Sequence, residues 1–266
     1  MTESQHRVRL GDLTVSAFSN AVEIRPVILL PLGSHEDHGP HQPMGDYILA
    51  DVLAERIARR ATEAGTATFV APCLPFGVAD YFSASPGGLA LTAGHFRGVL
   101  SDLLDGLLRH GLDKIVILNG HGGNVPVIHD VTLEIKRTRG LVIPSFYLWK
   151  IARQLMERRI SDGRERFGHG AEPLLSLNLA LRGEAVSPEA GEAEQYPRML
   201  GLPVSGFGTL DFEGLTVEAP VEFDMVPRDA IAPAWAAGSA ALGEDVAEAL
   251  VAAGARFVAQ VSTDVG

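Results

Sequence analysis

The chain has 266 residues, of which 46% are hydrophobic and 21% charged, a globular balance that suits one large α/β domain or two small ones. Acidic residues outnumber basic ones by 33 to 22, and the net charge of −11 argues against a nucleic-acid or anionic-membrane partner, because either needs a basic face. Cys73 is the single cysteine, which excludes a disulfide framework and a cysteine-based zinc site.

No segment approaches the roughly 20 uninterrupted apolar residues of a membrane span. The first residues, MTESQHRVRLGDL, contain no apolar stretch of the kind found in secretion signals. We therefore expect a cytoplasmic protein without a membrane partner.

The first half of the chain alternates short apolar runs, typical of buried strands, with apolar residues at helical spacing. Glycines and prolines separate these segments and mark their ends. In chain order, the sequence predicts a strand at 26–32, a helix from Tyr47 to Gly65, a strand at 67–75, a helix at 95–111 and a strand at 114–118.

The second half continues this alternation. Asn124 is placed as an N-cap, with Pro126 in the first turn of the helix that follows. The expected elements are this helix at 125–140, a strand at 141–149, a helix at 171–183, loops or short hairpins at about 186–229, an Ala-rich helix at 231–253 and a strand at 255–261.

Buried strands that alternate with helices predict an α/β fold, with a mostly parallel central sheet covered by helices on both faces. We expect a single domain over 1–266 with an irregular insertion at about 186–229. In such a sheet the active site lies at the C-terminal ends of the strands.

Polar residues gather at such strand ends. GSHEDHGPHQPMGDY (33–47) follows the first strand, and NGHGGN (119–124) follows the strand at 114–118. A third cluster, GHGAEPLLS (168–176), opens a helix, so that His169 and Glu172 can face the same crevice.

These clusters suit a metal site without thiol ligands. Glu36 and His38 are two residues apart and point to the same side of an extended segment, whereas Asp37 points away. His121 lies between glycines, which let the backbone bring its imidazole close to a ligand. Carboxylates and imidazoles together suit zinc, manganese or iron, and two adjacent ions are a recurrent means of activating water.

Simpler interpretations exist for each cluster alone. A single histidine in such a loop is more often a hydrogen-bonding residue than a ligand. NGHGGN could bind an anion before a helix, although it lacks the Lys-Ser/Thr of a P-loop. Glu172 could be an acid in a first helical turn. The coincidence of three clusters at one predicted edge favours the metal site.

The same residues carry a resemblance to the creatininase (creatinine amidohydrolase) family. The family's first motif corresponds here to PLGSHEDHGPHQP (31–43), its second to the intact NGHGGN (119–124) and its third to HGAEPLLS (169–176). GVADYFSASPGGLAL (77–91) loosely matches a segment between the first two. The resemblance covers at least residues 25 to 180 and implies the family's three-layer fold and a homo-hexamer.

The resemblance also implies a centre of two divalent ions per subunit, Zn or Mn with Fe as a third alternative. It implies Glu36 and Glu172 on one ion, His38 and His121 on the other, and a bridging aspartate. His169 matches the family's catalytic histidine, and Glu172 assists it.

The chain departs from the family pattern in three places. The carboxylate assigned to the bridge, Asp46, stands one residue closer to Glu36 than usual. Leu174 and Leu175 replace polar residues of the third motif. SPGGLAL (85–91) replaces the family's FPGTISL-like segment, and these changes together suggest a pocket that does not select creatinine.

The leading hypothesis is a metal-dependent hydrolase that cleaves a C–N bond of a small cyclic amide or formamide. One alternative is a hydrolase that opens a lactone or an inosose-type ring in sugar or cyclitol breakdown. Another is a catalytically silent metal-binding or ligand-binding relative. Tyr81, Phe82 and Trp149 are the predicted walls of the pocket.

Overall fold

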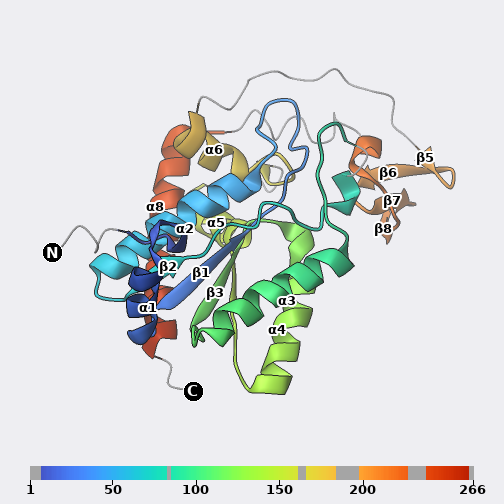
Figure 1. Cartoon of the computed structure of the whole chain (residues 1–266). Helices are drawn as coiled ribbons and strands as arrows, with labels where there is room; N and C mark the ends of the chain where they lie inside the picture. Colours follow the sequence, from blue (N-terminus) through green and yellow to red (C-terminus); the bar gives the residue numbers. More distant parts are fainter. Residues whose placement is uncertain (1–6, 83–84, 161–165, 184–197, 227–237, 264–266) are drawn as a thin grey trace.

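A sheet of four parallel strands lies at the centre of the computed structural model, which describes residues 7–82, 85–160, 166–183, 198–226 and 238–263 (Figure 1). The strand order is β2-β1-β3-β4. The strands are β1 (Val27–Leu32), β2 (Thr68–Val70), β3 (Ile115–Asn119) and β4 (Ser145–Tyr147). This arrangement confirms the predicted α/β class and its parallel sheet.

Helices cover both faces of the sheet, and β1 and β3 are therefore buried along their whole length. Alternate residues point to opposite faces, so Val27 and Leu29 join one core while Ile28 and Leu30 join the other. The helices that complete the first core include α2 (Asp46–Glu63), α5 (Leu148–Glu157) and α8 (Ala240–Thr263). Those that complete the second are α1 (Val15–Glu23), α3 (Ala93–Arg109) and α4 (Val125–Arg139).

Local chemistry sets several helix ends. The hydroxyls of Thr14 and Thr92 accept hydrogen bonds from Ala17 N and His95 N at 3.2 and 3.3 Å, and so cap α1 and α3. Helix α4 ends at Gly140, whose φ of +71° is the left-handed conformation that glycine adopts without strain.

The strand predicted at 255–261 is wrong, because these residues continue helix α8. Val251 and Val258 are buried one above the other at helical spacing. Gly254, which resembles a helix end in the sequence, lies inside α8, where a Cβ would stand 2.6 Å from the Ile57 side chain. None of the described helices, α8 included, combines the length and apolarity needed to cross a membrane.

The strand predicted at 141–149 is limited to its last part. β4 covers only Ser145–Tyr147, and α5 begins directly after it, so that Trp149 is helical. Leu148, Ala152 and Met156 are buried four residues apart, which fits a helix and not a strand.

Part of the predicted insertion forms a second, antiparallel sheet at one end of the molecule (Figure 1). Val204 and Leu210 of this sheet pack against Phe82 and Phe223. Its strands are β5 (Arg198–Met199), β6 (Leu202–Gly206), β7 (Thr209–Phe212) and β8 (Leu215–Glu218). Residues 184–197 and 227–237, and with them the start of the helix predicted at 231–253, lie outside the described residues.

The strand order reverses between β1 and β3. From β1 the chain crosses to β2 on one side, and it then returns to place β3 on the other side. The crevice at such a reversal, beyond the carboxyl ends of the strands, is where ligands bind in open α/β sheets. The two motifs that follow β1 and β3 therefore meet there.

Helix α6 (Leu174–Arg182) packs against α8 at a glycine. A Cβ at Gly243 would lie 1.9 Å from the Ser176 carbonyl oxygen, so we expect Gly243→Ala to force the helices apart and lower the free energy of unfolding by about 2–3 kcal/mol. Gly98, in the middle of α3, has no atom within 4 Å of its Cβ position. Gly98→Ala is the matched control and should raise the free energy of unfolding by about 0.5–1 kcal/mol. Urea unfolding measures both variants. Equal stability of the two variants would contradict the close packing.

Candidate functional site

The segment after β1 places two buried carboxylates next to each other. The Ser34 hydroxyl donates a hydrogen bond to Glu36 Oε2 at 2.7 Å, and the Ser34 backbone N–H donates to Asp46 Oδ1 at 2.6 Å. Asp46 is the first residue of α2, and both carboxylates are at most 3% exposed. Two buried carboxylates that share one hydrogen-bonding partner need their negative charge balanced by protons or cations.

His121 joins these carboxylates from the end of β3. Its Nδ1 lies 3.2 Å from Glu36 Oε2 and 3.5 Å from Asp46 Oδ2. Its Nε2 lies 2.8 Å from the Val78 carbonyl oxygen, which can only accept, so Nε2 carries a proton and donates it. This leaves Nδ1 directed at the two carboxylates.

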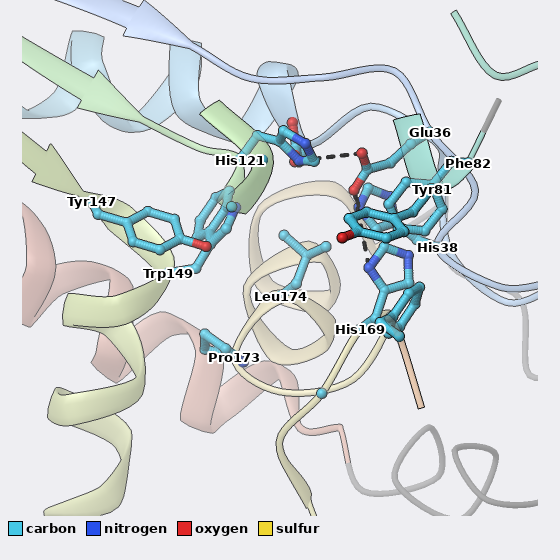
Figure 2. A pocket seen from close by; sticks show the side chains of 16 residues that line it. Glu36, His38, Tyr81, Phe82, His121, Tyr147, Trp149, His169, Pro173 and Leu174 are labelled. Atoms are coloured by element: carbon cyan, nitrogen blue, oxygen red, sulfur yellow. Dashed lines mark ion pairs between the residues drawn. The ribbon is translucent and has the colours of Figure 1, made fainter. Parts of the chain in front are cut away.

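His38 and His169 show the same arrangement. His38 Nδ1–H donates to the Pro43 carbonyl at 3.2 Å, while Nε2 lies 3.4 Å from Glu36 Oε1. His169 Nε2–H donates to the Asp37 carbonyl at 2.5 Å, while Nδ1 lies 4.0 Å from Glu36 Oε1. Each of the three imidazoles thus gives one N–H to a backbone carbonyl and turns its other nitrogen toward Glu36 (Figure 2). Histidine ligands of metal ions are commonly held in this way.

The donors form two overlapping groups, Glu36 with His38 and His169, and Glu36 with Asp46 and His121. Within each group the ligand atoms all lie within 4.8 Å of one another. Both groups combine carboxylate oxygen and imidazole nitrogen, which suits zinc, manganese or iron. The residues present therefore fit divalent cations.

This grouping differs from the predicted sharing of ligands. Glu36, and not Asp46, belongs to both groups, and His121 lies with Glu36 and Asp46 whereas His38 lies with His169. Asp46 nevertheless reaches the site, because Ser34 holds it beside Glu36 in spite of the shortened spacing.

Glu172 lies in neither group. Its carboxylate is buried and accepts hydrogen bonds from the backbone N–H and the hydroxyl of Ser176, at 3.1 and 2.5 Å. Burial raises the pKa of this carboxyl above its ordinary value. The structure therefore does not bring Glu172 to Glu36, although each of its oxygens keeps a second lone pair for a further partner.

Burial and mutual contacts set the protonation of the site. Burial alone would raise the pKa of Glu36, but contacts with His121 and His38 outweigh it and lower that pKa. Burial acts to lower the pKa of His121, but Asp46 and Glu36 raise it well above its ordinary value. A cation that binds between His121, Glu36 and Asp46 must displace the proton that His121 carries toward the two carboxylates.

His169 lies in a cage of rings. Phe82 stacks on it at 4.5 Å between centroids, and Phe207 and Phe223 pack at 5.0 Å each. Burial lowers the pKa of His169 to about 3, and the charge on His38 adds to this effect. The imidazole is therefore neutral at physiological pH.

A cavity of about 390 Å³ opens beside the donor groups. The predicted walls Tyr81, Phe82 and Trp149 all line it, and so does Leu174, one of the departures from the third motif. Tyr147 and Phe207 line it as well and were not predicted. Tyr147 is the last residue of β4, so placing the end of that strand correctly would have predicted it at the site. Phe207 lies in a glycine-rich turn, and no sequence signal links it to the site.

Buried amides hold the three motifs together. Asn124 directly precedes α4, as predicted, but its side chain makes no capping hydrogen bond to that helix. It donates to the Gly33 carbonyl at 3.2 Å and accepts from Val78 N–H at 2.9 Å, which joins the first and second motifs. His41 and Gln42 both donate to the carbonyl oxygen of Gly170, next to His169.

Comparisons with known proteins identify similar chains and folds. The sequence profile of the creatininase family, described as creatinine amidohydrolase, matches residues 11–258. The chain is 30% identical over 149 residues to the mycofactocin precursor peptide peptidase of Mycobacterium ulcerans, and 25% identical over 242 residues to the 3-dehydro-scyllo-inosose hydrolase of Thermotoga maritima. The first alignment covers 51% of this chain and only 57% of that relative, and the second covers 85% and 74%.

The fold is similar to that of a crystal structure of creatinine amidohydrolase, with a TM-score of 0.76 and 23% identity over 97% of this chain and 99% of the other. Similar solved creatininases include a manganese form and a zinc–zinc form.

Asn124 provides a test of the junction between the motifs. We expect Asn124→Ala to lower the free energy of unfolding by about 2 kcal/mol, because the buried Val78 N–H and Gly33 carbonyl lose their partner. Asn20→Ala, on the exposed surface of α1, should change stability by less than about 0.5 kcal/mol. Denaturant unfolding measures both, and an Asn124→Ala protein as stable as the control would contradict the assigned role.

Proposed function

The chain belongs to the creatininase family of metal-dependent amidohydrolases, and from this premise we propose that it hydrolyses a C–N bond of a small cyclic amide or formamide with two divalent ions. One observation carries the proposal. Three histidines are each fixed by a backbone carbonyl and turn their second nitrogen toward one buried carboxylate, Glu36.

We assign Glu36, His38, Asp46 and His121 as metal ligands, with Glu172 as a further ligand once its carboxylate turns from Ser176. Zinc and manganese suit this donor set, and both occur in similar creatininases. Ions bound there would supply Lewis acidity, lowering the pKa of water and polarising a substrate carbonyl.

His169 has the position of a proton carrier. It lines the cavity beside Glu36, where its imidazole would pass a proton to a leaving nitrogen. The hydrogen bond to the Asp37 carbonyl fixes the ring, so Nδ1 is the atom that exchanges the proton. Glu172 would assist from its place within the third motif.

A second candidate is hydrolysis of a lactone or an inosose-type ring. The observation in its favour is the Thermotoga inosose hydrolase, whose alignment covers more of this chain than that of the peptidase. The same metal centre could act on a ring ketone, so the two candidates share their ligands and differ in the pocket.

A hydrolysis screen of the metal-loaded protein decides between them. It should cover creatinine, formamides, cyclic ureas and imides, lactones and inososes. We expect turnover of a cyclic amide or formamide that a chelator abolishes. Turnover restricted to lactones or inososes would favour the second candidate, and binding without turnover would identify a catalytically silent relative.

Metal uptake tests the ligand assignment. We expect two ions per wild-type chain by elemental analysis after loading and dialysis, neither ion in Glu36→Gln, and one ion in His121→Ala and in Glu172→Gln. Asp37→Asn is the matched control, because Asp37 caps the turn at Gly39 N–H and belongs to neither donor group. Fewer than about one ion per wild-type chain would overturn the metal centre.

His169→Ala separates a proton carrier from a ligand. We expect kcat to fall by about 10²–10⁴-fold while the number of bound ions stays unchanged. His129→Ala, on the exposed face of α4, should leave both quantities unchanged. Loss of an ion from His169→Ala would instead make His169 a ligand in the group with His38.

A further inference from the structure

The cavity has two chemically different sides. Glu36, His38 and His169 lie on one side, and Tyr147 and Trp149 lie on the other, with Leu174 between them (Figure 2). A substrate whose reacting bond meets the donor groups must therefore direct its remaining atoms toward rings and an aliphatic side chain.

The apolar side carries no charged side chain among its described residues. Among the described residues that line the cavity, the ionised or basic side chains are those of the two donor groups, and none is lysine or arginine. An anionic substituent would find no guanidinium or ammonium group there. A cationic substituent would find no carboxylate apart from Glu36 and Asp46, which the metal ions would occupy.

The apolar side also offers few hydrogen bonds. The indole N–H of Trp149 donates to the Gly120 carbonyl, so Trp149 presents only its ring surface. The Tyr147 hydroxyl has no hydrogen bond to any described residue, and it lies 3.1 Å from the point that a Cβ on Gly122 would occupy. Glycine at this position leaves room for the phenol, and Tyr147 can donate to one substrate atom.

Leu174 and Leu175, the two departures in the third motif, have different roles. Leu174 lines the cavity at the start of α6. Leu175 faces Gly238, where a Cβ would stand 2.6 Å from its Cγ, and is part of the packing between α6 and the segment before α8. Only Leu174 therefore bears on what the cavity accepts.

We propose that the site is specific for neutral amides that carry a flat apolar substituent, seated against Tyr147, Trp149 and Leu174 with the Tyr147 hydroxyl as its polar contact. This inference rests on the proposed function and names its substrate class. A volume of about 390 Å³ exceeds what a small bare ring fills and suits such a substituent. A polyol ring would leave most of its hydroxyls facing the rings unpaired.

Three hydroxamates with one shared chelating group test the inference without turnover. They are acetohydroxamate, benzohydroxamate and succinic acid monohydroxamate, each titrated calorimetrically into the zinc-loaded full chain. We expect benzohydroxamate to bind at least about tenfold more tightly than the other two, since its ring enters the apolar side. Equal or tighter binding of the succinyl probe would overturn the inference while leaving the proposed function intact.

Variants then locate the effect. Leu174→Ala should weaken benzohydroxamate at least about fivefold and leave acetohydroxamate unchanged, because only the ring loses its contact. Tyr147→Ala, at a partly buried side chain of the same apolar side, is the second variant and should act in the same direction. An unchanged preference in both variants would overturn the assigned wall. Failure of all three probes to bind the wild-type chain would overturn the proposed function and the inference together.

Discussion

Parallel pairing of β1 with β3 brings together the first two polar motifs of the site. In this register Leu32 is opposite Asn119, and the Gly120 N–H donates to the Leu32 carbonyl at 2.7 Å, so both strands end at the same level. Ser34 and His121, which are 87 residues apart in sequence, are thereby in hydrogen-bond contact at 3.1 Å. The buried strands provide the apolar packing that holds this pairing, and the hydrogen bonds of Asn124 add to it from the segments that follow.

Fixed histidines give the site a defined arrangement that the protein itself maintains. Three backbone carbonyls each hold one imidazole N–H, and the remaining nitrogens converge on Glu36. Because the carbonyls belong to the first motif and to the loop around Val78, the orientation of the rings is decided by the backbone. Little side-chain entropy remains to be lost when a ligand binds between them.

Sequence patterns were sufficient for the parallel sheet and for the positions of its motifs, because strand ends and glycine turns have local signatures. They were insufficient where packing between distant segments determines how long a helix is or which partner a side chain has. Gly254 resembles a helix end but fits against Ile57 inside α8, and Asn124 resembles a cap but bridges two loops. The grouping of ligands around Glu36 depends on side-chain directions, which residue spacing does not contain. Phe207 reaches His169 only through the fold of the second sheet.

The ring cage around His169 has a consequence for how the protein can evolve. Phe207 and Phe223 come from the second sheet and its neighbouring turn, whereas the residues assigned to metal binding come from the central sheet and the helices around it. Substitutions in the outer sheet can therefore change the packing and the hydration around the histidine without replacing any residue assigned to metal binding. The surroundings of His169 can accordingly change separately from the carboxylates and imidazoles that follow β1 and β3.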